Sequence, residues 1–272
     1  MRLVTLRTTD GTRAGRVEGD EVVELAASDV GAALAAGSVD AAPGAARHPL
    51  ADVDLAPVVP NPSKVFCLGL NYEHHIREMT RELPTHPTLF AKFADALTGP
   101  RDPIVLPNTS NAVDWEGELV IVIGRRVRGA SASEAEAAIA GFAVGNDVSM
   151  RDWQTRTMQW LQGKTWERAS PVGPAVVSPD EVGGPNPDLQ LRVTVCEEMM
   201  QEARTGDLLF KPVDVVAYIS TIVTLNPGDL VFTGTPGGVG AARQPPRFLR
   251  PGDVVRTSIE GLGELVNEFV SE

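Results

Sequence analysis

The pattern of apolar and polar positions predicts a chain built mainly of short β-strands. From Met1 to about Leu25, polar and apolar residues alternate between turn-forming glycines, which is typical of small strands. An alanine-rich stretch from Ser28 to Ala36 predicts a short helix, whereas five prolines between Pro43 and Pro62 oppose regular structure. We therefore expect a small N-terminal β domain over residues 1–60, followed by a larger domain over 61–272.

Two apolar runs in the larger domain predict buried strands. The first extends from Glu116 to Ile123 and contains LVIVI, a run that indicates burial on both faces. The second begins at Phe142 and ends near Asp147, which places that aspartate at the end of a strand. Because turn motifs of the Pro-Gly-Asp type precede apolar segments twice in the C-terminal half, we expect mostly sheet there. The predicted fold class is α+β, mainly β with some α.

Two capping-box patterns predict where helices begin. Ser133 with Glu136 predicts a helix that runs through Ile139 before Gly141 ends it. Ser149 with Asp152 predicts a second helix directly after the strand that ends near Asp147. On that helix Arg151 and Gln154 are three positions apart, so we expect the two side chains to share one face.

Charge and composition exclude several classes of partner. The formal net charge is -12, so nucleic acid and anionic membrane surfaces are poor partners, because the overall field would repel them. The two cysteines, Cys67 and Cys196, have neither redox nor zinc-site spacing, and we expect both to be reduced thiols. The N-terminal stretch lacks the apolar core of a signal peptide, and no run could span a bilayer. The cytoplasm is the expected location.

Three carboxylates could form a metal site. Glu116 and Glu118 are two apart at the start of a strand, so both point to one face. Taken alone, this pair is more typical of a solvated strand end. Because the following run is buried, however, the two like charges lie where core meets surface, and a cation would relieve their repulsion. With Asp147 as a third oxygen ligand, the set favours Mg²⁺, Mn²⁺ or Ca²⁺ over zinc.

Two further positions could carry proton transfer and charge stabilisation. His75 is followed by Glu78 three residues later, an arrangement that could orient the imidazole as a general base, although a surface His beside a surface Glu would look the same. Lys164, between Trp160 and Trp166, could stabilise an oxyanion or could simply extend along the aromatic rings. Thr235 lies in TGTPGGVG, which lacks the ending of a nucleotide-binding P-loop.

Motifs in a fixed order make the chain resemble the fumarylacetoacetate hydrolase family over about residues 60–270. They are GLNYEHHIRE, LFAKF, DWEGELVIVIG, GNDVSMRDWQ, the Trp-x-x-x-Lys of 160–164, PGDLVFTGTPGGVG, RPGDVV and EGLGEL. One departure is the Cys196-Glu197 pair, where members of the family usually carry Asn-Gly in a hairpin turn. We therefore expect a reshaped hairpin and altered contacts near Gln201.

The resemblance implies a mixed β-sandwich/roll catalytic domain and a homodimer. It implies a Mg²⁺ or Mn²⁺ ion held by Glu116, Glu118 and Asp147. It also implies a catalytic His75–Glu78 dyad on a segment that closes over the substrate. Substrate-facing positions of the family match Arg151, Gln154, Lys164 and Thr235.

The activity expected from this resemblance is hydrolysis of a C–C bond in a 2,4-dioxo acid, such as an acylpyruvate or fumarylpyruvate, to a carboxylic acid and a pyruvate-type product. The same chemistry would suit decarboxylation of an oxaloacetate-like 2-oxo acid or keto–enol isomerisation. The His75–Glu78 pair favours hydrolysis, because a base is needed to make the nucleophile, but it could equally transfer a proton in tautomerisation. A non-catalytic binding protein that keeps the fold is a more remote alternative.

Overall fold

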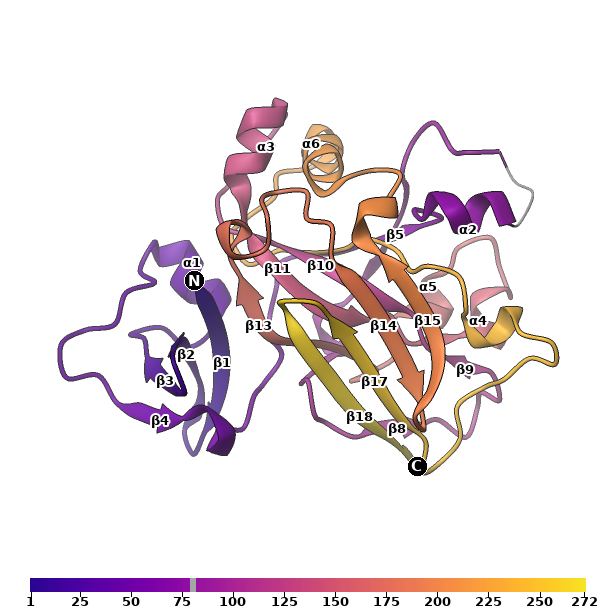
Figure 1. The fold of residues 1–272 in the computed structure, drawn as a ribbon, viewed down its shortest axis with the longest axis horizontal. Coiled ribbons are helices and arrows are strands. Elements are labelled where there is room, and N and C mark those ends of the chain that lie inside the picture. Colours follow the sequence, from indigo (N-terminus) through magenta and orange to yellow (C-terminus); the bar gives the residue numbers. More distant parts are fainter. Residues whose placement is uncertain (79–81) are drawn as a thin grey trace.

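The computed structural model describes residues 1–78 and 82–272, except for the side chains of His75 and Glu78. Its largest feature is a mixed sheet of eleven described strands, whose main path runs β4-β3-β2-β1-β13-β11-β10-β16-β5-β6, with β7 paired to β13 (Figure 1). These strands are β1 (Arg2–Thr8), β2 (Gly11–Glu18), β3 (Glu21–Glu24), β4 (Arg47–Pro49), β5 (Val65–Gly69), β6 (Thr88–Lys92), β7 (Leu97–Thr98), β10 (Gly117–Ile123), β11 (Ile139–Asn146), β13 (Ser170–Val177) and β16 (Leu230–Phe232).

A second sheet covers one face of the first. Its order is β15-β14-β17-β18-β8, and a separate short pair joins β9 to β12. The bounds are β8 (Ile104–Leu106), β9 (Val113–Asp114), β12 (Ser149–Met150), β14 (Gln190–Val195), β15 (Glu198–Arg204), β17 (Val254–Ile259) and β18 (Gly263–Ser271). The helices are α1 (Val30–Ala36), α2 (Glu73–Glu78), α3 (Ala132–Ala138), α4 (Arg151–Gln154), α5 (Leu161–Lys164) and α6 (Pro212–Ile222). This architecture confirms the predicted α+β class.

The N-terminal strands continue the large sheet. Figure 1 shows β1 to β4 and α1 as a lobe at the left, and β1 pairs antiparallel with β13 through Arg2 and Leu3. The expectation that no regular structure lies between Pro43 and Pro62 is wrong at β4, because Arg47 and His48 complete the ladder beside β3. The division into domains at residues 1–60 and 61–272 stays a prediction.

Strand β10 positions the candidate site. Every residue from Gly117 to Ile123 is buried, as the LVIVI run predicted. Gly117 faces the second sheet, where a Cβ atom would come within 2.3 Å of Val193. Since side chains alternate along a strand, Glu118 points away from that sheet, toward the opposite face of the large one. Close packing on one face therefore directs the glutamate into the other.

Both capping-box predictions need correction. Helix α3 begins two residues earlier than expected, with Ser131 as the N-cap and Glu134 completing the box. It ends at Ala138, because Ile139 already belongs to β11. Ser149 does not cap α4 either, because it lies in β12 and its hydroxyl donates to the carbonyl of Asp147 at 2.8 Å.

The hairpin at Cys196-Glu197 keeps a two-residue turn. The φ angles of Cys196 and Glu197 are 49° and 69°, and Val195 pairs directly with Glu198. Positive φ at both central residues is what a type I′ turn requires. The expectation of a reshaped hairpin is therefore wrong, and the non-glycine residues adopt the strained conformation instead.

Candidate metal centre

The three predicted carboxylates meet at the end of the β10–β11 pair. Glu118 pairs with Gly145, and the N–H of Asp147 donates to the carbonyl of Glu116 at 2.8 Å. This antiparallel register brings residues some thirty positions apart to one edge. One oxygen from each of Glu116, Glu118 and Asp147 lies within 4.8 Å of the others, and all three residues are buried.

Glu118 is the least neutralised of the three. Its Oε2 accepts a hydrogen bond from the N–H of Gly234 at 2.7 Å, whereas its buried Oε1 has no hydrogen-bond partner among the described residues. Burial, reinforced by the charges of Asp147 and Glu116, raises the pKa of Glu118 well above its ordinary value. A buried carboxylate oxygen without a donor, next to two other hard oxygen donors, fits a divalent cation. The described residues therefore suit the metal that the sequence analysis expected.

Two lysines contact the carboxylates. The ammonium of Lys164 donates to Glu116 Oε2 at 2.6 Å and to Asp147 Oδ2 at 2.9 Å. Lys92 Nζ lies 2.6 Å from Asp147 Oδ1 and also donates to the carbonyl of Lys164. Burial alone would raise the pKa of Asp147, but the charges of Lys164 and Lys92 outweigh it and lower that pKa. Burial likewise opposes the charge on Lys164, but Asp147 and Glu116 outweigh it and raise its pKa.

Arg151 ties the cluster to helix α4. Its Nη1 lies 2.7 Å from Glu116 Oε1, and its Nε donates to buried Asp114 at 2.8 Å. Nη1 also donates to Gln154 Oε1 at 3.0 Å, which confirms that the two side chains share a face. Asp114 Oδ1 in turn accepts from the N–H of Gly240, and Oδ2, which binds the arginine, accepts from the N–H of Ala241, so the backbone at 240–241 holds the aspartate in place.

The cluster opens onto a cavity of about 200 Å³. The four residues expected to face the substrate all line it, and Glu116 joins them, whereas Glu118 and Asp147 lie deeper. The lining residues are Leu68, Gly69, Leu70, Phe90, Glu116, Arg151, Gln154, Trp160, Lys164, Thr235 and Val239. The ring of Trp160 lies so close to Gly69 that a Cβ there would come within 2.5 Å of it. The structure thus lines this cavity with both polar groups and aromatic rings.

Gln201 connects the cavity wall to β10. This buried side chain accepts from the N–H of Gly117 at 3.0 Å and donates to Thr235 Oγ1 at 2.8 Å. Thr235 Oγ1 in turn donates to the carbonyl of Gly117 at 3.0 Å. Gln201 therefore holds the threonine against the residue that separates the two glutamates, although the turn near it departs from the family sequence.

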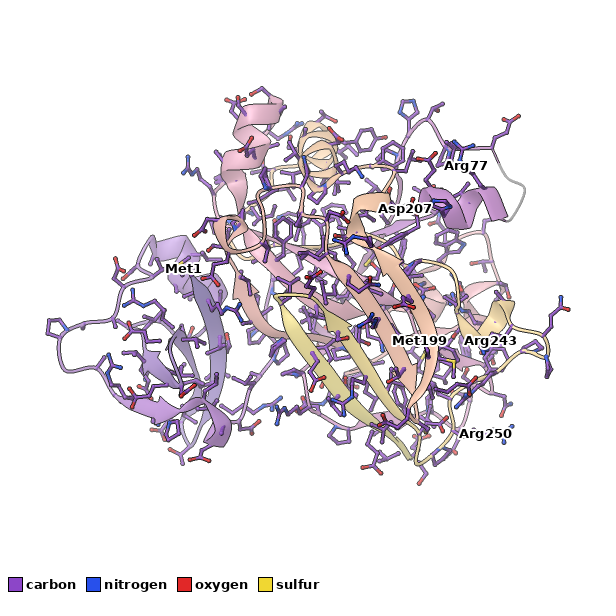
Figure 2. The ribbon with its side chains drawn as sticks, viewed as in Figure 1. Met1, Arg77, Met199, Asp207, Arg243 and Arg250 are labelled. Carbon is purple, nitrogen blue, oxygen red and sulfur yellow. The ribbon has the colours of Figure 1, made fainter. Side chains whose placement is uncertain are left out.

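The predicted dyad is only partly described. Helix α2 carries the backbone of His75 and Glu78, but their side chains lie outside the described part of the structure. The N–H of His74 in this helix donates to the carboxylate of Asp207 at 3.1 Å. Figure 2 labels Asp207 and Arg77, another residue of the helix. The roles of His75 and Glu78 therefore stay predictions.

Sequence reasoning missed three residues of this site, namely Lys92, Asp114 and Gln201. One signal was present for the lysine, because LFAKF places a cation inside an otherwise apolar strand. Asp114 stands two positions before Glu116, on the same alternation as the two glutamates. For Gln201 the sequence offered no such pattern.

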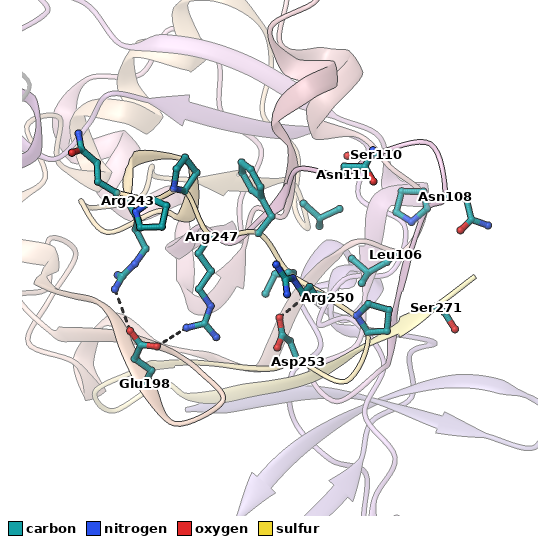
Figure 3. A pocket seen from close by; sticks show the side chains of 18 residues that line it. Leu106, Asn108, Ser110, Asn111, Glu198, Arg243, Arg247, Arg250, Asp253 and Ser271 are labelled. Atoms are coloured by element: carbon teal, nitrogen blue, oxygen red, sulfur yellow. Dashed lines mark hydrogen bonds and ion pairs between the residues drawn. The ribbon is translucent and has the colours of Figure 1, made fainter.

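A larger cavity lies elsewhere, lined partly by the loop of residues 243–251. It measures about 1030 Å³ and, among the described residues, shares none with the cavity at the carboxylates. Figure 3 shows Glu198 of β15 in contact with Arg243 and Arg247, with which it forms ion pairs of 3.2 and 2.5 Å. Two of its arginines therefore share the negative charge of one carboxylate.

Relatives with described activities share most of this chain. Oxaloacetate tautomerase FAHD2B, mitochondrial, of Bos taurus is 47% identical over 218 residues, covering 79% of this chain and 69% of its own. The 2-hydroxyhepta-2,4-diene-1,7-dioate isomerase of Mycobacterium marinum is 36% identical with a TM-score of 0.83, covering 100% of this chain and 99% of its own. Maleylpyruvate hydrolase of Sphingobium sp. SYK-6, solved with manganese(II) and pyruvate, is 31% identical with a TM-score of 0.82 and the same coverage.

These comparisons correct the expected location. The bovine relative and its human counterparts are named as mitochondrial proteins, so the cytoplasmic location expected from the sequence is wrong by this comparison. Among the described residues, every helix is too short or too polar to cross a bilayer.

Family models match both parts of the chain. Residues 1–57 match the model described as Rv2993c-like, N-terminal. Residues 64–270 match the model described as fumarylacetoacetate (FAA) hydrolase C-terminal, which covers the carboxylates, both lysines, Arg151 and Gln201. The relatives act on oxo acids by isomerisation or hydrolysis. The chain therefore belongs to the fumarylacetoacetate hydrolase family and is an enzyme of the oxo-acid chemistry found there.

Proposed function

We propose that the chain is a divalent-metal-dependent tautomerase that interconverts the keto and enol forms of a small 2-oxo acid of the oxaloacetate type. The observation that carries the reaction type is the 47% identity over 218 residues with a protein named oxaloacetate tautomerase. The small cavity supports a small substrate, because about 200 Å³ is less than most ligand pockets provide. This choice reverses the sequence-based ranking, which put hydrolysis first.

The proposed metal ligands are Glu116, Glu118 and Asp147, with Mg²⁺ or Mn²⁺ as the ion. Support comes from their grouped, buried oxygens and from the manganese in the related maleylpyruvate hydrolase structure. Bound there, such an ion would supply a Lewis acid that polarises a 2-oxo group.

The residues around the cavity would bind and orient the acid. Arg151 and Lys164 provide cationic groups for carboxylate and developing enolate oxygens, while Gln154 and Thr235 provide hydrogen-bonding groups at the wall. Phe90 and Trp160, whose ring centroids lie 5.5 Å apart in an edge-to-face contact, also line the cavity and would exclude water from it.

A proton must leave or reach the carbon next to the oxo group. We assign this transfer to His75, oriented by Glu78, since a histidine titrates close to neutral pH and can act as both base and acid. A homodimer is part of the same proposal and rests on the family resemblance.

Hydrolysis of a C–C bond in a 2,4-dioxo acid is the second candidate. It is favoured by the similarity to maleylpyruvate hydrolase, solved with pyruvate, and by the His75–Glu78 pair in the sequence, which could also activate water. Decarboxylation of oxaloacetate is a further alternative, because it would require the same cationic and metal-binding groups.

One experiment separates these reactions. The protein is incubated with Mn²⁺ and either oxaloacetate, acetylpyruvate or fumarylpyruvate, and the products are followed by NMR. Faster keto–enol exchange of oxaloacetate without net loss of substrate supports the tautomerase. Pyruvate together with a carboxylic acid from an acylpyruvate would instead identify a hydrolase, and pyruvate with CO₂ a decarboxylase.

A further inference from the structure

The contacts of Lys164 differ from those of the other cations at the carboxylates. Lys164 bridges two of the proposed metal ligands, at 2.6 Å to Glu116 Oε2 and 2.9 Å to Asp147 Oδ2. Lys92 contacts only one of them, Asp147, through the other oxygen, Oδ1. Arg151 likewise contacts only Glu116, through Oε1.

The Lys164 ammonium lies between two carboxylates, where a bound metal ion would also place its positive charge. Lys92, Lys164 and Arg151 face the carboxyl groups of Asp114, Glu116, Glu118 and Asp147 in a buried cluster, so three cationic side chains meet four acidic ones. A single positive charge between two carboxylates offsets repulsion that would otherwise be costly away from water. A divalent cation could offset the same repulsion at the same oxygens.

The two lysines also differ in their freedom to leave. Lys92 ends β6 and its ammonium is fully buried, where it also donates to the carbonyl of Lys164. Lys164 ends the short helix α5 and lines the cavity of about 200 Å³. An ammonium displaced from the carboxylates would therefore have adjoining space on its own side of the cluster.

We propose that the Lys164 ammonium and a divalent cation compete for Glu116 Oε2 and Asp147 Oδ2, so that metal binding releases Lys164 into the cavity. There the ammonium becomes available to the carboxylate of the substrate. Metal binding would thus favour an anionic substrate indirectly, through the released ammonium, in addition to any direct contact between metal and substrate. This inference rests on the metal site of the proposed function and adds an exchange of cations to it.

The first test measures Mn²⁺ binding by calorimetry without substrate. If Lys164 competes with the ion, Lys164→Met binds Mn²⁺ more tightly than the wild type, by about tenfold or more. Lys211→Met removes the same charge at a distance and should leave the affinity unchanged. Lys92→Met removes a cation that contacts one carboxylate and serves as the control for charge. If Lys164→Met gains no more Mn²⁺ affinity than Lys92→Met, the gain is explained by the lost charge alone and the proposal is overturned.

The second test follows the ammonium itself and does not depend on a variant. An amine-reactive reagent labels the wild-type protein with and without Mn²⁺, and mass spectrometry compares Lys164 with Lys211. Competition predicts faster labelling of Lys164 on Mn²⁺ addition and no change at Lys211. Unchanged or slower labelling of Lys164 in a protein that binds Mn²⁺ overturns the exchange alone, whereas a wild type that binds no Mn²⁺ overturns the metal site as well.

Discussion

Glu118 accepts a hydrogen bond from the N–H of Gly234 through Oε2 at 2.7 Å, whereas its Oε1 has no partner among the residues that the structure describes. The backbone supplies one hydrogen bond to a carboxylate that is otherwise buried beside Asp147 and Glu116. Such a group costs folding free energy unless a cation joins it. The buried charge of Glu118 therefore destabilises the metal-free protein, although the same charge favours binding of the metal.

Replacing Glu118 by glutamine should separate these two effects. The amide oxygen can still accept from Gly234, while the buried charge disappears. We expect the free energy of unfolding of the metal-free protein to rise by about 1–3 kcal/mol, as measured by urea denaturation. Mn²⁺ affinity, measured by calorimetry on the same sample, should fall by at least about tenfold. A loss of both stability and affinity would contradict this account of Glu118.

The stability of the metal-free protein should decrease as pH rises above about 4.5. The pKa of Glu118 is raised on folding, so the folded state favours the protonated carboxyl and loses stability as pH rises from the unfolded value through the folded one. The pKa of Asp147 is lowered on folding, so this residue stabilises the folded state as pH rises. That contribution to stability is already complete above its ordinary pKa of 3.8, and so it adds no slope at higher pH. Urea midpoints over this range should fall in the wild type and stay flatter in Glu118→Gln or with saturating Mn²⁺. Equal slopes in all three would refute the assignment.

His75→Ala should remove catalysis and spare the metal. The proposed proton transfer needs an imidazole, whereas the proposed metal ligands are all carboxylates. We expect the turnover number to fall by about a hundredfold or more while the Mn²⁺ dissociation constant stays within about twofold of the wild type. Joint loss of turnover and Mn²⁺ binding would point to a structural role for this residue.

The hairpin turn offers a gain in stability. Glu197 adopts a φ of 69°, which costs a non-glycine residue about 1 kcal/mol, so Glu197→Gly should stabilise the protein by a similar amount. Thr194→Gly in the adjoining strand β14 is the matched control and should destabilise it, because glycine there gains nothing from a positive φ. Thermal denaturation of both variants tests this, and destabilisation by Glu197→Gly would show that the turn bears no such strain.

Part of the site could be predicted from local patterns. Alternation placed Glu116 and Glu118 on one face, and the end of an apolar run placed Asp147 at the end of a strand. Lys92 was missed as a partner of Asp147, because it comes from β6, which is separated from β11 by three strands in the sheet order. The contact between Lys92 and Asp147 therefore cannot be predicted from their spacing along the chain.

The start of helix α3 shows why a correct motif can still be misplaced. Both Ser131 and Ser133 precede a glutamate by three positions, so the sequence contains two equivalent capping boxes. The structure uses Ser131, because the chain must leave the helix at Ala138 to enter β11. Ser131→Ala should therefore cost about 1 kcal/mol in thermal denaturation, and Ser133→Ala close to nothing.

The central claim is that the three carboxylates bind a divalent metal which the protein needs for its reaction on a small 2-oxo acid. The most direct measurement is the rate of oxaloacetate keto–enol exchange, followed by ultraviolet absorbance, as Mn²⁺ is titrated into chelator-treated wild type and Glu118→Ala. The account predicts that activity returns with Mn²⁺ in the wild type and stays at the protein-free rate in the variant. Equal catalysis by both proteins, unaffected by the chelator, would contradict it.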